Sequence, residues 1–210
     1  ALGWQIDVDP RIAAAAPDFA AFLRTSDDVL IVGMLDGATR ERADLGAGFH
    51  QHSLMVTTEA RAITPGLVSA LRSVSSFSGG ARGNLFLDPL TWDRKTGDFV
   101  RLDHFLSEDA AGWKALQSIA RILRADLSAR EGLWADGIAM AAVPDPAALQ
   151  SFTLEPSTTQ GRIGGLAFHF APYELGPCSA GPQRAVVPQA AFRSSLKPQF
   201  RALFDGAPAD

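Results

Sequence analysis

The first third of the chain combines a strand pattern with a helix pattern. Residues 4–8 alternate apolar and polar side chains, as a half-buried strand does. The pair Pro17-Asp18 then predicts a helix start, because proline fits the first turn and an acid is favourable near the positive end of the helix dipole. Apolar side chains recur from there at roughly helical spacing. The apolar run 29–32 is also typical of a buried strand, but the pattern favours one long or broken helix over residues 18–45.

The middle of the chain predicts an antiparallel meander. Alternating segments are separated by short clusters of turn-forming residues. The predicted strands cover residues 53–62, 67–77, 85–92 and 99–102. The turns between them fall at 64–66, at the glycine-rich bend 78–83 and at the hairpin 93–97. Leu54, Val56 and Thr58 are expected on one face of the first of these strands.

The last part predicts helices around further strands. Ser107, Glu108 and Asp109 are typical of a helix start, and apolar residues spaced by three and four follow as far as Leu127. Strands are predicted at 152–154, 165–170 and 184–187, and a terminal helix at 190–204, interrupted near Pro198. The predicted fold class is α+β, with antiparallel sheets packed against a few helices in two closely packed lobes, residues 1–63 and 64–210.

Size and charge narrow the class of protein. A chain of 210 residues with 47% hydrophobic and 20% charged residues is of ordinary globular composition. It buries roughly 70% of its unfolded surface, so no metal or disulfide is needed for stability. The net charge of −4 argues against a nucleic-acid partner. No stretch approaches the ~20 apolar residues of a membrane span. Because the chain starts at Ala1, we expect that a leader or tether has been removed.

Two residue types raise the question of a metal or a nucleophile. His50 and His52 share a face if they lie on a strand, and two imidazoles can begin a zinc site. No HExxH or CxxC accompanies them, so two surface histidines are the preferred interpretation. Cys178 is the only cysteine and has no neighbouring base in the sequence. We therefore interpret it as a small buried apolar residue, and predict neither a metal nor a cofactor.

The remaining polar chemistry is compatible with two functions. The bend 78–83 offers backbone N–H groups and Arg82, which can form an anion nest, although glycines here more often serve a tight bend. Acids such as Asp7 and Asp9 could hydrolyse glycosides only if a pair were held roughly 5–10 Å apart. The sequence brings no such pair together, and no G-x-S-x-G elbow is present.

Aromatic side chains near turns give a further functional signal. Tyr173 is the only tyrosine and lies in a segment rich in proline and glycine, while Trp92 and Trp134 lie near turns. Such rings can stack on sugars or anchor a protein partner. They can equally cover the core, which is the more frequent role of any one of them.

Two segments carry a family resemblance. The first is Phe77-Ser78-Gly79-Gly80-Ala81-Arg82-Gly83-Asn84, followed by Leu90-Thr91-Trp92-Asp93-Arg94-Lys95-Thr96-Gly97 and Leu102-Asp103-His104-Phe105. The second runs from Gly165 to Leu175 as GLAFHFAPYEL, and continues through Ala180-Gly181-Pro182 to Val187-Pro188. Together they resemble the RsiV/PdaC-like extracytoplasmic domain family. This domain of unknown function is shared by the lysozyme-sensing anti-sigma factor RsiV and the non-catalytic part of the peptidoglycan deacetylase PdaC.

The resemblance implies an α+β domain of the bacterial cell envelope or periplasm that binds or senses rather than catalyses. It implies helix over 18–45, and a lysozyme-like protein or a peptidoglycan fragment as partner. The chain departs from the family pattern at Arg82, where the family has histidine, and at Cys178, where it has tyrosine. The candidate binding residues are Gly79, Gly80, Arg82, Asn84, Trp92, Tyr173 and Glu174. A cell-wall glycan hydrolase with an unidentified carboxylate pair and a structural lipoprotein domain remain the alternatives.

Overall fold

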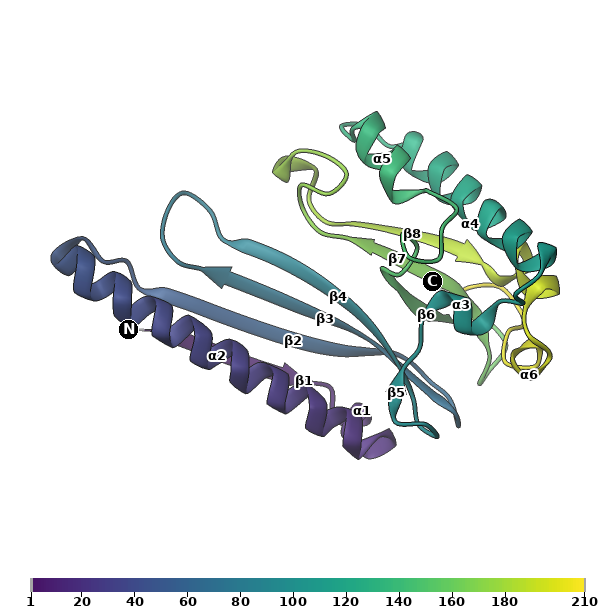
Figure 1. The fold of residues 1–210 in the computed structure, drawn as a ribbon, viewed down its shortest axis with the longest axis horizontal. Helices are drawn as coiled ribbons and strands as arrows, with labels where there is room; N and C mark the ends of the chain where they lie inside the picture. Colours follow the sequence, from purple (N-terminus) through teal and green to yellow (C-terminus); the bar gives the residue numbers. More distant parts are fainter. Residues whose placement is uncertain (1, 210) are drawn as a thin grey trace. The chain divides into compact units, whose positions relative to one another are not determined.

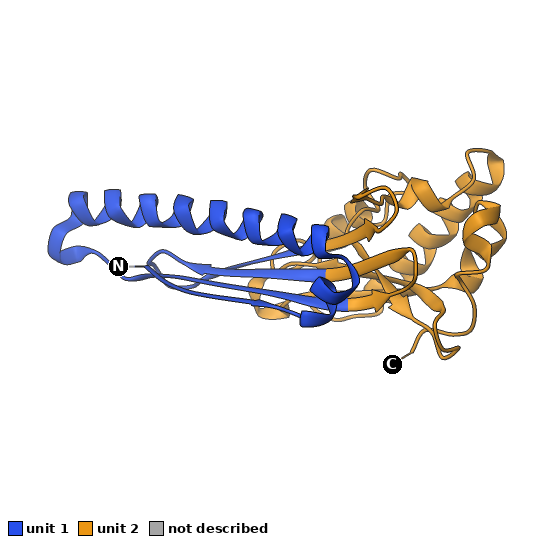
Figure 2. Ribbon diagram, turned by 90° about the horizontal axis from the view of Figure 1, so that it is seen from below, with its two compact units in different colours: residues 1–60, 71–88 blue, residues 61–70, 89–210 orange. Residues whose placement is uncertain are grey.

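The computed structural model describes residues 2–209, which divide into two compact units. Unit 1 consists of residues 1–60 and 71–88, and unit 2 of residues 61–70 and 89–210 (Figure 2). Three long strands therefore begin in one unit and continue into the other. The predicted α+β class is confirmed, since helices accompany two separate sheets. The predicted division between residues 63 and 64 stays a prediction.

The first sheet has five strands in the order β1-β2-β3-β4-β5 (Figure 1). Its strands are β1 (Leu2–Val8), β2 (His52–Ile63), β3 (Leu67–Phe77), β4 (Asn84–Asp93) and β5 (Asp98–Phe99). Strand β1 runs parallel to β2, with Trp4 opposite Leu54. Parallel neighbours need a crossover connection, which here contains helices α1 (Pro10–Ala15) and α2 (Pro17–Leu45) and the 3₁₀ turn η1 (Gly46–Gly48).

Helix α2 confirms the prediction over residues 18–45, and the strand alternative for 29–32 is wrong. In unit 1 the helix lies along one face of the sheet (Figure 1). Its residues Leu30, Ile31 and Met34 pack against a small core of sheet residues. Those core residues are Leu2, Leu54, Val56 and Val74. The helical period turns Val29 and Val32 to solvent, which a fully buried strand would not do.

Most of the predicted strands and turns of the meander are confirmed. The turn at 64–66, the bend at 78–83 and the hairpin at 93–97 all occur where the sequence places them. Strand β5 is shorter than the predicted 99–102, because Leu102 already begins helix α3 (Leu102–Phe105). Leu102 is fully buried in the core of unit 2, and this burial takes the chain away from the sheet edge.

Unit 2 contains the second sheet, of order β6-β7-β8, and the remaining helices. The strands are β6 (Phe152–Pro156), β7 (Ile163–Phe170) and β8 (Gln183–Pro188). The helices, 3₁₀ turns included, are α4 (Ala110–Ser128), α5 (Ala135–Ala141), η2 (Cys178–Ala180), η3 (Gln189–Ala191), η4 (Arg193–Ser195) and α6 (Pro198–Arg201). Helix α5 was not predicted, since its seven residues have too short a pattern to show a period.

Helix α4 begins where the sequence predicts. The Asp109 carboxylate accepts hydrogen bonds from the backbone N–H groups of Ala111 and Gly112, at 2.9 and 3.4 Å. This N-cap satisfies donors that the first turn would otherwise leave unpaired. The apolar stripe of the helix, from Leu116 to Leu127, then joins the same core as Phe168 of β7.

The C-terminal prediction of a helix over 190–204 is wrong. The chain instead makes two 3₁₀ turns and the single turn α6. Leu196 is extended and forms a bridge with Leu106. Pro198 disfavours helical backbone in the preceding residue, and Lys197 indeed has a ψ of 142°, outside the helical region. Tertiary pairing and one proline therefore override the helix propensity of this segment.

Candidate functional site

The predicted site residues are divided between the two units. Unit 1 holds Gly79, Gly80, Arg82 and Asn84, all in or beside the β3–β4 bend. Unit 2 holds Trp92, Tyr173 and Glu174. The assignment of these residues to a site stays a prediction.

The bend between β3 and β4 requires its glycines. Gly79 and Gly80 have φ angles of 98° and 89°, a region that residues with a side chain rarely adopt. At Gly83 a Cβ would lie 2.9 Å from the Ser76 carbonyl oxygen, so only glycine lets the two strands approach this closely. Arg82 and Asn84 are exposed at the end of this bend. The predicted interpretation of these glycines as a tight bend is confirmed.

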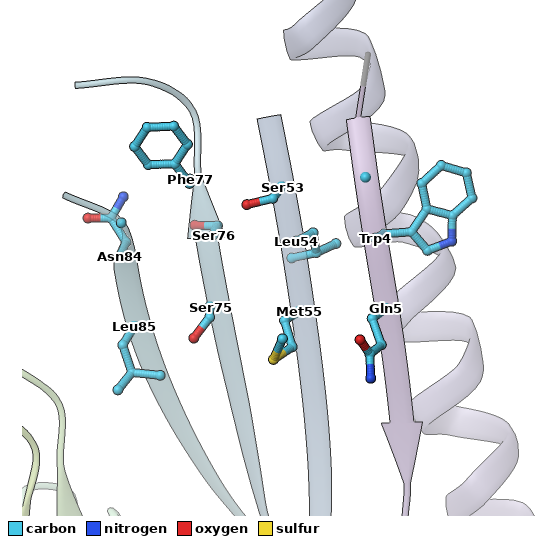
Figure 3. Close-up of a pocket in the computed structure, with 12 residues that line it drawn as sticks. Trp4, Gln5, Ser53, Leu54, Met55, Ser75, Ser76, Phe77, Asn84 and Leu85 are labelled. Carbon is cyan, nitrogen blue, oxygen red and sulfur yellow. The ribbon is translucent and has the colours of Figure 1, made fainter. Parts of the chain in front are cut away.

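Below the bend, the sheet of unit 1 has a hollow on the face opposite α2 (Figure 3). Its volume is about 570 Å³, within the range of small-ligand sites. Adjacent strands contribute to it side by side. The polar lining residues are Gln5, Ser53, Ser75, Ser76 and Asn84, and the apolar ones are Trp4, Leu54, Met55, Phe77 and Leu85. Of these, Trp4 and Leu54 are paired neighbours that alternate onto the α2 face and only border the hollow.

The strand register explains how this lining forms. In the parallel pair, Gly3 lies opposite Ser53 and Gln5 opposite Met55, so these residues share one face of the sheet. Their neighbours Leu54 and Val56 point to the other face, toward α2. Among the described residues that line the hollow, none carries a charge. Neutral hydrogen-bonding groups therefore alternate with apolar side chains across several strands.

Sequence reasoning found only Asn84 among the residues of this hollow. The strand alternation already places Met55 on the polar face of β2, where an exposed apolar side chain is unexpected. This mismatch is the feature of the sequence that could have indicated the hollow. The sequence could not show that β1 lies beside β2, because that pairing connects segments about fifty residues apart.

The two histidines of the metal hypothesis differ in environment. His50 is exposed and lies against Gly79, whereas His52 is buried and hydrogen-bonds to the Glu41 carboxylate of α2. The prediction of two surface histidines is therefore wrong for His52. Among residues 2–209 there is no group of three or more potential metal ligands. Cys178 is half-buried in the 3₁₀ turn η2, not fully buried as predicted.

The acids named for glycoside hydrolysis have other partners. Asp9 caps α1 and binds Arg11 at 2.6 Å, and the hydrogen bond from the Arg11 side chain lowers the pKa of Asp9 to about 2. Asp7 accepts a hydrogen bond of 2.7 Å from Gln5. Both carboxylates are thus engaged locally in unit 1.

The loop after β7 in unit 2 holds an exposed aromatic ring on unusual backbone. Tyr173 has a φ of 74° and a side chain that is 60% exposed. The loop is anchored by a 2.7 Å hydrogen bond from the Trp134 backbone N–H to the Leu175 carbonyl. Desolvation raises the pKa of the neighbouring Glu174 carboxyl. A non-glycine residue in this region costs about 1 kcal/mol and often marks a functional position.

Replacing Tyr173 by glycine tests this backbone strain. We expect the free energy of unfolding to stay equal or to rise by up to about 1 kcal/mol, because glycine adopts this φ without strain. Urea denaturation measures it, with Tyr173→Phe as the control that keeps both ring and strain. A loss of more than about 1 kcal/mol would show that the contacts of the ring outweigh the strain.

Trp92 does not offer its ring to solvent. It is only 7% exposed and packs edge-to-face on Phe99, with ring centroids 5.0 Å apart. This contact joins β4 to β5 at their paired residues. The alternative interpretation, that the ring covers the core, fits this position.

Comparison with known proteins gives the class of fold. No protein-family model and no curated protein matches the sequence. The structure is similar to that of a DUF3298 family member from Bacteroides fragilis, with a TM-score of 0.56 and 16% identity over 90% of this chain and 76% of that chain. A DUF3298 family protein from Pseudomonas aeruginosa gives a TM-score of 0.47 and 19% identity, over 78% of this chain and 66% of that chain.

The first of these likenesses shows a shared fold. DUF3298 is the RsiV/PdaC-like type of domain that the two sequence motifs resemble, so the comparison supports a domain of this type at the level of fold. Within residues 2–209, no helix combines the length and the apolar character needed to cross a membrane.

Proposed function

We propose that this chain is a non-catalytic binding module of the bacterial cell envelope, and that the hollow of unit 1 binds an uncharged segment of cell-wall glycan. Family membership and an extracytoplasmic location are parts of this proposal. They are supported by the two sequence motifs and by the fold shared with the Bacteroides fragilis protein.

The lining of the hollow carries the proposal. A sugar ring presents hydroxyl groups at its rim and an apolar face of C–H groups. Gln5, Ser53 and Ser75 supply neutral donors and acceptors, while Met55 and Phe77 supply apolar contact. Because the lining carries no charge, a neutral ligand can bind without burying an ion, and the cost of desolvating that ion is avoided.

Titration calorimetry with soluble, peptide-free glycan fragments of peptidoglycan tests the proposal. We expect Met55→Lys to reduce affinity at least roughly tenfold, since it places a charge in the hollow. Met140→Lys is the matched control, because Met140 is also an exposed methionine but lies on α5 of unit 2. No heat of binding from the parent chain, or equal losses in both variants, would contradict the proposal.

A lysozyme-like protein is the second candidate ligand. The exposed Tyr173 on strained backbone favours it, because aromatic anchors on fixed loops are typical of protein interfaces. Binding of lysozyme that is lost in Tyr173→Ala but kept in Met55→Lys would support this candidate over the glycan.

A further inference from the structure

The outer edge of β4 is open over Asn84–Asp88. Among the described residues, 2–209, the only strand beyond β4 in the sheet is β5, which pairs with it at Trp92 and Asp93 alone. Within residues 2–209, no isolated bridge involves residues 84–88. An open edge presents unpaired backbone N–H and C=O groups, which are a template for another strand.

Residues 84–88 carry one charged side chain of the kind that discourages edge pairing, Asp88, but no lysine and no proline. Proteins protect edge strands with lysine, with proline inside the strand or with a covering element. The segment reads Asn-Leu-Phe-Leu-Asp, and Phe86 at its centre is 59% exposed. The proline of β4, Pro89, directly follows this segment inside the strand, so it limits pairing to residues 84–88.

We propose that a second copy of this chain pairs with this edge in antiparallel orientation, about a two-fold axis at Phe86. This register places Phe86 opposite the same residue of the second copy, and Leu85 opposite Leu87. Gly83 falls opposite Pro89, which has no N–H to donate, so the ladder ends at the same point on both sides. The five-stranded sheets of the two copies then form one continuous sheet.

A second copy is the expected partner because the segment 84–88 is complementary to itself in this register. Antiparallel pairing sets Asn84 opposite Asp88, so an amide donates to a carboxylate and no two acids face each other. Alternation along β4 places Asn84, Phe86 and Asp88 on one face of the strand, and Leu85 and Leu87 on the other. Each side chain thus has a compatible partner on its own face of the joined sheet.

The expected complex is weak and reversible. Five residue pairs bury less than the ~1,200 Å² of a standard stable interface. Association is therefore expected to depend on protein concentration and to be lost on dilution. Self-pairing goes beyond ligand binding in the hollow, although Asn84 and Leu85 take part in both.

Cysteine trapping tests the register directly. In a Cys178→Ser background, Phe86→Cys places two thiols opposite each other at the two-fold axis, with Cβ atoms about 4.5–5.5 Å apart and close to disulfide reach. Under mild oxidation we expect cross-linking roughly tenfold faster than for Val32→Cys, because pairing raises the local thiol concentration. Val32 is 57% exposed on α2 and matches Phe86 in exposure. Equal rates for the two variants would overturn the proposal.

Sedimentation equilibrium of the cysteine-free chain gives a second measurement. We expect the mean mass to rise above 22.3 kDa with concentration in the parent and in Val32→Lys, but not in Phe86→Lys, with circular dichroism verifying the fold of each. A parent that stays at 22.3 kDa, or a Phe86→Lys variant that associates like the parent, would contradict self-association. Binding of an unrelated extended peptide by a monomeric chain would also do so.

Discussion

The Arg72→Met variant is expected to lose about 3–5 kcal/mol of unfolding free energy, because it leaves a buried carboxylate without its partner. Asp27 of α2 and Arg72 of β3 are both buried, and the guanidinium donates from Nε and Nη2 to Asp27 Oδ1 at 3.1 and 2.5 Å. The other oxygen, Asp27 Oδ2, has no hydrogen-bond partner, so the pair is held by one oxygen alone. Urea denaturation, with hydrogen exchange of the α2 amides as the local probe, measures the loss.

Two further variants distinguish the effect of the unpaired charge from the effect of lost side-chain packing. The double variant Asp27→Leu/Arg72→Met should recover most of the loss, since apolar side chains of similar size can replace a buried ion pair at little cost. Arg101→Met removes the exposed Arg101–Asp103 pair, whose atoms are 3.6 Å apart, and should change stability by less than about 1 kcal/mol. If the double variant is as unstable as Arg72→Met, loss of packing and not the unpaired charge is responsible.

Acidification from pH 7.5 to pH 5 should destabilise unit 2 by about 2 kcal/mol through His169. Burial first, and then the charges of Arg61 and Arg184, lower the pKa of His169 to about 4, against 6.5 for the unperturbed group. The folded chain therefore keeps the ring neutral while the unfolded chain binds a proton. Stability from this group is fully present above about pH 6.5 and is lost progressively down to about pH 4, by ~3 kcal/mol in total.

The difference between the parent and His169→Gln isolates this effect. Glutamine can replace the 2.9 Å hydrogen bond between His169 Nε2 and Thr153 Oγ1 but does not titrate in this range. Urea midpoints at the two pH values should therefore differ less in the variant than in the parent. Circular dichroism at pH 7.5 verifies that the variant keeps the fold. An unchanged pH dependence in His169→Gln would refute the assignment.

Local patterns were sufficient for most strands, for the turns and for the start of α4. Alternation over residues 53–62 and 67–77 identifies strands because one face of each must be buried. Local sequence was insufficient at β5 and over 190–204, where the burial of Leu102 and the bridge of Leu196 to Leu106 determine the backbone. These contacts are non-local, so no window of sequence contains them.

The candidate site shows the same division. The glycine-rich bend can be predicted from the sequence, because the backbone at Gly79 and Gly80 needs a residue without a side chain. The burial of Trp92 and the hollow around Met55 cannot be predicted in this way, since both depend on which strands become neighbours.

The sequence by itself therefore determined the α+β class, the long helix α2 and the positions of the main bends, through side-chain periodicity and backbone sterics. The tertiary structure alone decided that β1 lies beside β2, that His169 is buried on β7 and that the edge of β4 stays open. The physical reason is that pairing and burial depend on contacts between segments far apart in the chain, whose free energy no local pattern records.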